Sequence, residues 1–160
     1  MSAPTLASSP LVKNAFAGFI AGFPAGYFTS AKIPQAKVKK TEVHPAGSPV
    51  AIKVPSGLAE IEDMEIKGFQ GTDGALDRSI TEWSQQCAGV NRLGRATAKP
   101  LDAKRVVTVE QYDGDGTVVH RWKAHGAFLL EGGAIELEGG DENPAMRDMK
   151  LSVDWVEQVL

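Results

Sequence analysis

Apolar and polar side chains alternate along residues 104 to 157, and this pattern restricts that part of the chain to strands with one buried face. Every second residue from Met149 to Trp155 is apolar, and the residues between them are charged or hydroxylated. Glycine-rich turns interrupt the pattern, because glycine tolerates the positive φ of tight turns. These turns are Asp113-Gly114-Asp115-Gly116, Gly132-Gly133 and Gly139-Gly140-Asp141. The pattern predicts a meander, that is, antiparallel strands that follow one another in chain order.

Residues 15 to 31 carry no charge and are flanked by Lys13 and Lys32. A transmembrane helix needs about 20 predominantly apolar residues. This stretch is shorter and contains Pro24 and several glycines, so we expect no membrane insertion. A helix and a pair of short strands that turn near residues 22 to 26 both remain open, although each interior glycine costs a helix about 1 kcal/mol.

The segment from Lys37 to Val54 predicts an exposed hairpin. Its first strand is charged, its turn is Pro45-Ala46-Gly47-Ser48-Pro49, and a second strand returns from Val50. Residues 60 to 69 predict a further strand with four acids near its start, which we interpret as a solvated face.

A helix is predicted from Gly74 to Ala88, because Leu76, Ile80, Trp83 and Cys87 recur at spacings that place them on one face. Thr72 or Asp73 is suited to cap its start, and Gly89 to end it. We expect this helix to cover a sheet. The single Cys87 excludes an internal disulfide and is interpreted as a small core residue. We interpret Trp83, Trp122 and Trp155 as core anchors rather than as stacking surfaces for sugars or bases.

The titratable residues form no catalytic or metal-binding pattern. His44, His120 and His125 have no companion cysteine and no ligand spacing. Asp113 begins a run similar to a calcium loop, but Val118 and Ala124 occupy the loop positions that require glycine and glutamate. We therefore expect no enzymatic activity, no cofactor and no bound metal.

Charge is unevenly distributed along a chain whose net charge is -3. Tight, sequence-independent binding of DNA is not expected from such a balance, because it depends on a cationic surface. Most charge runs are solvated faces. Two runs of opposite sign are nevertheless candidates for contacts between subunits or rings. The candidate residues are Lys37, Lys39, Lys40 and Glu42 in the hairpin, and Glu131, Glu136 and Glu138 in an acidic stretch.

Small motifs spaced along nearly the whole chain resemble the major tail tube protein of contractile-tailed bacteriophages. Those that carry the resemblance include Asn14-Ala15-Phe16, Ser30-Ala31-Lys32-Ile33-Pro34, Ala46-Gly47, Pro49-Val50, Gly57-Leu58 and Gly68-Phe69. The strands from Val106 to Tyr112 and from Arg121 to Gly126 agree with the same pattern. The chain departs from it in residues 1 to 12, a longer N-terminal arm rich in Ser, Ala and Pro.

The resemblance implies one domain over residues 1 to 160, mainly β with one flanking α-helix, in an antiparallel β-sandwich or barrel. It implies a homohexamer whose rings stack into the inner tube of a virion tail, assembled in the host cytoplasm. The implied partners are the tail sheath, baseplate and tail terminator proteins, a tape measure protein in the lumen, and DNA in transient, non-specific passage.

Two alternatives to a phage tail tube remain open. One is the inner tube of a bacterial contractile injection or secretion device. The other, from a different class, is a monomeric β-barrel that binds a small apolar ligand with the Phe- and Gly-rich segment at residues 15 to 31. The oligomeric state separates the second alternative from a tube subunit.

Overall fold

The computed structural model describes residues 11, 13, 15–24, 26–96, 100–140 and 142–160. Of the predicted N-terminal arm only Leu11 is among them, so that prediction lies outside the described residues. The elements, in chain order, are β1 (Phe16–Ile20), β2 (Phe28–Lys32), β3 (Ala36–Val43), β4 (Ile52–Ile61), β5 (Met64–Phe69), α1 (Ala75–Ala88), η1 (Pro100–Ala103), β6 (Arg105–Tyr112), β7 (Val118–Glu131), β8 (Met146–Ser152) and β9 (Trp155–Gln158).

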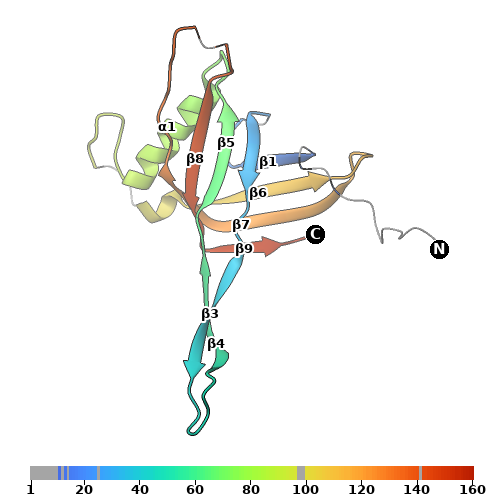
Figure 1. Cartoon of the computed structure of the whole chain (residues 1–160). Helices are drawn as coiled ribbons and strands as arrows, with labels where there is room; N and C mark the ends of the chain where they lie inside the picture. The colour runs from blue at the N-terminus through green and yellow to red at the C-terminus, as the bar shows by residue number, and fades with distance from the viewer. Residues whose placement is uncertain (1–10, 12, 14, 25, 97–99, 141) are drawn as a thin grey trace, which may run out of the picture.

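The main sheet is antiparallel and has the strand order β1-β6-β7-β8-β5-β2, with β9 paired to β7. The long strand β7 joins two halves of this sheet. Its first part pairs with β6 and β9, and its last residues pair with β8. As a result β2, β5 and β8 cross the direction of β1, β6 and β9 in Figure 1. The predicted mainly β, antiparallel fold with one helix is confirmed.

The C-terminal strands do not form the simple meander that the sequence predicts. Strands β6, β7 and β8 follow one another, but β9 turns back and pairs with β7 instead of extending beyond β8. The Asp154 N–H donates to the His125 carbonyl at 2.9 Å, which fixes the bend between β8 and β9. The bend interrupts the alternation after Val153. Trp155 is consequently 50% exposed, and the prediction that it is a core anchor is wrong.

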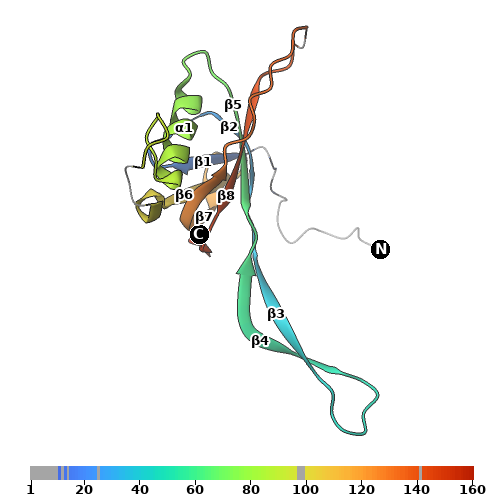
Figure 2. The same cartoon turned by 90° about the vertical axis from the view of Figure 1, so that its left-hand side faces the viewer.

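Helix α1 covers one side of the curled sheet (Figure 2). Leu76, Ile80 and Trp83 are fully buried against the inner residues of the sheet, and the Trp83 indole N–H donates to the Ala103 carbonyl at 2.8 Å. Gly89 ends the helix with φ 69°, as predicted for a left-handed C-terminal residue. At the other end, Gly74 holds the N-cap position, while the Asp73 carboxylate accepts the Ala75 N–H at 3.2 Å.

Residues 15 to 31 contain β1 and all of β2 except its last residue, so the helical alternative for this segment is wrong. Each strand pairs with a different part of the main sheet, β1 with β6 and β2 with β5. A turn follows β1, in which the Phe23 N–H donates to the Ile20 carbonyl. Gly22 lies in this turn with φ 81°. Among the described residues, no helix has the length and apolar character needed to cross a membrane.

Strands β3 and β4 form a separate two-stranded sheet that projects away from the body (Figures 1 and 2). We call residues 36–61 the projecting hairpin. It is longer than the segment from Lys37 to Val54 that the sequence predicts. The strand predicted at residues 60 to 69 is divided, because its first two residues complete β4, the next two lie between the strands, and residues 64 to 69 form β5.

Candidate assembly surfaces

Several strands have a neighbour on one side only. Within the described part of the chain, β1 of the main sheet pairs only with β6, β2 only with β5, and β9 only with β7, while β3 and β4 pair only with each other. The outer edge of such a strand carries backbone N–H and C=O groups that can bind another strand. These edges are the parts of the fold that can extend the sheets into a second molecule.

The projecting hairpin also exposes many apolar side chains. Val43 lies opposite Ile52 in the strand register, and Val54 is on the same face. The large apolar residues exposed along the hairpin are Val38, Val43, Val50, Ile52, Val54 and Leu58. An isolated two-stranded hairpin is marginally stable in water, and contiguous exposed apolar surface is typical of interaction sites. The hairpin is therefore the best candidate for a contact surface.

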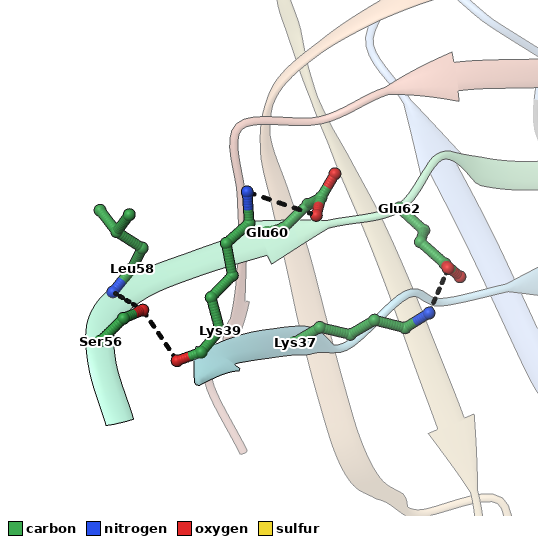
Figure 3. Close-up of polar contacts among 6 residues, drawn as sticks. All are labelled: Lys37, Lys39, Ser56, Leu58, Glu60 and Glu62. Atoms are coloured by element: carbon green, nitrogen blue, oxygen red, sulfur yellow. Dashed lines mark hydrogen bonds and ion pairs between the residues drawn. The ribbon is translucent and has the colours of Figure 1, made fainter. Parts of the chain in front are cut away.

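Two of the lysines predicted to contact another ring have acidic partners in their own subunit (Figure 3). Lys37 pairs with Glu62, and Lys39 Nζ lies 3.8 Å from Glu60 Oε2. The hydrogen bond with Lys37 lowers the pKa of the Glu62 carboxyl and raises that of the lysine. All four side chains are exposed, so solvent screening leaves each pair with little effect on stability. The hairpin is thus less basic than its first strand alone suggests.

Lys40 and Glu42 are exposed on the distal part of β3. Their cross-strand neighbours are Pro55 and Lys53, respectively. Near the base of the hairpin, the Ser56 hydroxyl donates to the Lys39 carbonyl at 2.8 Å and accepts the Leu58 N–H at 3.4 Å, which holds an irregularity in β4 (Figure 3).

The acidic candidates lie on the connection between β7 and β8. We call residues 131–138 the acidic segment. Glu131 ends β7, and Glu136 and Glu138 are exposed in a stretch with no assigned secondary structure. Figures 1 and 2 show that this connection rises to the end of the molecule opposite the projecting hairpin. The structure therefore does not bring the basic and acidic candidates together within one subunit, but places them toward opposite ends.

A buried arginine fixes the start of the acidic segment, and the sequence analysis missed it. Arg147 is 6% exposed, and its Nη1 donates to Asp77 Oδ1 on α1 at 2.6 Å. Its Nη2 donates to the Gly132 carbonyl at 3.1 Å. Asp77 also accepts a hydrogen bond from Gln70. The signal was present in the sequence, because Arg147 is in phase with the buried residues Met149 and Leu151.

The path of the chain at Gly133 is equally constrained. Its φ is 73°, and a Cβ atom added there would lie 2.4 Å from the Asp148 carbonyl oxygen. Only glycine fits this close approach to β8. The acidic segment therefore leaves the sheet in a defined direction.

A second arginine ties the N-terminal strands to the helix. Arg105 Nη1 donates to the Ala21 carbonyl at 2.7 Å, and its Nη2 donates to Gln86 Oε1 at 2.8 Å. The guanidinium carbon lies 5.0 Å from the centre of the Trp83 ring, within range of a cation–π interaction. Burial lowers the pKa of this arginine. The group is structural, since it joins β6, α1 and the turn after β1.

Among the described residues, no three His, Cys, Asp or Glu side chains are grouped so as to hold a metal ion. Cys87 is partly buried, and its Sγ accepts the Leu129 N–H at 3.4 Å. Burial raises the pKa of this thiol, which favours the unreactive protonated form.

No family model matches the sequence, and no curated protein does. A likeness in fold is seen in solved structures. A chain of the sheath/tube terminator of an extracellular contractile injection system, PVC, superposes with a TM-score of 0.75 and 13% identity over 97% of this chain and 100% of that chain.

Two further structures share the fold. A chain of the six-fold symmetrised baseplate of the anti-feeding prophage gives a TM-score of 0.70 with 10% identity, covering 95% of this chain and 97% of that one. Hcp1 from Flavobacterium johnsoniae gives a TM-score of 0.56 with 12% identity, covering 91% of this chain and 94% of that one. The resemblance to tube proteins inferred from the sequence is therefore confirmed at the level of the fold.

Proposed function

We propose that this chain is a structural subunit that assembles into hexameric rings, and that these rings stack into the inner tube of a contractile injection assembly. The projecting hairpin carries the proposal. A two-stranded hairpin that exposes a row of apolar side chains gains stability when another molecule covers them. The similarity in fold to chains of contractile injection systems supports the same function.

Closed rings require two different, complementary surfaces on each subunit, so that the contact is head to tail. The free edges of β1, β2 and β9 supply such surfaces, because each can accept a strand from a neighbour. The six-fold symmetry named for the anti-feeding prophage baseplate supports six copies in a ring. Stacking of rings requires matching surfaces at the two ends of the subunit, where the hairpin and the acidic segment lie (Figure 2).

The proposed partners are a sheath protein outside the tube, baseplate and terminator proteins at its ends, and a tape measure protein in its lumen. The sheath/tube terminator structure with the same fold supports the sheath and terminator proteins as partners. The assembled, tail-like particle is the proposed location of the chain.

The sequence resemblance favours a phage tail, whereas the PVC structure with this fold comes from an extracellular contractile injection system. We therefore place the injection device first. The nucleic-acid content of purified particles tests this choice. An injection device yields particles without packaged DNA. Particles joined to a DNA-filled head would instead favour the phage tail, with DNA passing through the tube.

The small-ligand carrier receives less support. Phe23, Tyr27 and Phe28 of the aromatic N-terminal segment pack against the core of the subunit. Sedimentation of the purified full chain separates the two functions. A tube subunit forms species several times larger than 17.0 kDa as its concentration rises, whereas a carrier stays at that mass at every concentration.

A further inference from the structure

Residues 134–138 have the sequence of a strand but no strand partner in the described structure. Ile135 and Leu137 alternate with Ala134, Glu136 and Glu138, which is the pattern of a strand with one apolar and one acidic face. Ile135 is 56% exposed and Leu137 is 83% exposed. When another strand is added beside such a segment, its backbone N–H and C=O groups form hydrogen bonds and its exposed apolar side chains are covered.

The edge of β3 is suited to supply that strand. Strand β4 has a proline at position 55 and an irregularity near Gly57, whose φ is 78°. Pro55 lacks an N–H, so the outer edge of β4 is interrupted. Strand β3 contains no proline from Ala36 to Val43, and its outer edge has no partner in the described structure.

The side chains of the two segments are complementary. Lys37 and Lys39 lie on one face of β3, and Val38 lies on the other. A register that places Val38 opposite Leu137 brings the two lysines beside Glu136 and Glu138 for either strand direction. Because Lys37 already pairs with Glu62 and Lys39 with Glu60, each ammonium group then lies between two carboxylates.

We propose that residues 134–138 become a strand by pairing with β3 of a second copy of this chain. The partner is a second copy because β3 and the acidic segment extend toward opposite ends of one subunit (Figures 1 and 2). This inference rests on the proposed function and deepens it, since it assigns the strands that join neighbouring subunits. The candidate lysines and glutamates then act together with a backbone hydrogen-bond ladder rather than as isolated ion pairs.

Disulfide cross-linking tests the pairing in the full-length chain. In a Cys87→Ser background, which keeps an acceptor for the Leu129 N–H, copies with Val38→Cys are mixed with copies with Leu137→Cys and oxidised after assembly. Directly opposed residues of paired strands have Cα atoms within disulfide range. Covalent dimers should form between the two kinds of copy. In the matched control, copies with Glu136→Cys replace those with Leu137→Cys, and this side chain points to the other face, so at least about tenfold less dimer is expected.

Tubes that contain no covalent dimer, or equal amounts with both partners, would overturn the strand pairing and leave the proposed function intact. A parent protein that never assembles would refute both. Hydrogen exchange on the unsubstituted chain gives a second readout that depends on no cysteine. Amides of residues 134–138 should exchange at least about tenfold more slowly in tubes than in free subunits. Equal exchange in the two states would contradict the added strand.

Discussion

The apolar face of the projecting hairpin is the feature whose removal should separate assembly from folding. Ile52 and Val54 are 54% and 39% exposed in the subunit and lie on one face of β4. Replacing both with threonine keeps β-branched side chains, which favour strands, and introduces a hydroxyl group at each position. We expect the subunit to fold with little change in its free energy of unfolding, and to assemble poorly.

The magnitude follows from the exposed surface. Together the two side chains expose nearly the surface of one complete aliphatic side chain, and its burial contributes about 2 kcal/mol per copy. Losing that contribution raises the subunit concentration at which tubes form by about thirtyfold. Light scattering or pelleting over a concentration series measures this threshold, and urea unfolding of the unassembled subunit measures stability.

The matched control is Val106→Thr, which alters a valine with 43% exposure on β6 of the main sheet. It should leave the assembly threshold within about fivefold of the unsubstituted value, because one partly exposed valine contributes less than about 1 kcal/mol even if it is covered. An Ile52→Thr, Val54→Thr double variant that assembles at the original concentration would show that the hairpin face stays exposed in the tube. The argument from its apolar surface would then fail.

Three further predictions concern charged groups. Arg147→Ala should lower the free energy of unfolding by about 3 kcal/mol in urea titrations, because Asp77 loses its buried partner. The control Lys150→Ala, on the outer face of β8, should lower it by less than about 0.5 kcal/mol. Equal losses for the two variants would contradict a stabilising role of the Arg147–Asp77 pair. Reversing Lys39 and Lys40 to glutamate should shorten tubes in micrographs, and unchanged lengths would argue against charge pairing between subunits. A hydrogen bond from the Tyr27 hydroxyl lowers the pKa of the Asp73 carboxyl. The ionised carboxylate therefore stabilises the fold above about pH 4, and this stabilisation is lost as the pH falls toward the lowered pKa. Unfolding midpoints from pH 6 to 3 should therefore fall less for Asp73→Asn, and parallel curves would refute the contribution.

Local patterns in the sequence predict the local elements well. Helix α1 was predicted because its buried residues repeat at helical spacing, and its left-handed end was predicted at Gly89. The hairpin was predicted because a Pro- and Gly-containing turn separates two extended stretches. In each case the information lies within about 15 residues, where periodicity and turn chemistry act.

Contacts between distant segments could not be predicted in the same way. The pairing of β9 with β7 depends on a bend after Val153 that breaks the alternation without any glycine or proline at that point. The Arg147–Asp77 ion pair joins residues 70 positions apart. Predicting it requires knowing which face of α1 packs against β8. The pairs that partly neutralise Lys37 and Lys39 were missed because residues 60 to 62 were assigned to the following strand.

Electron microscopy of the purified full-length chain, concentrated without any partner protein, tests the central claim most directly. The account predicts hollow tubes built from stacked rings with six subunits each. A uniform population of single subunits at high concentration, with no rings, would contradict it.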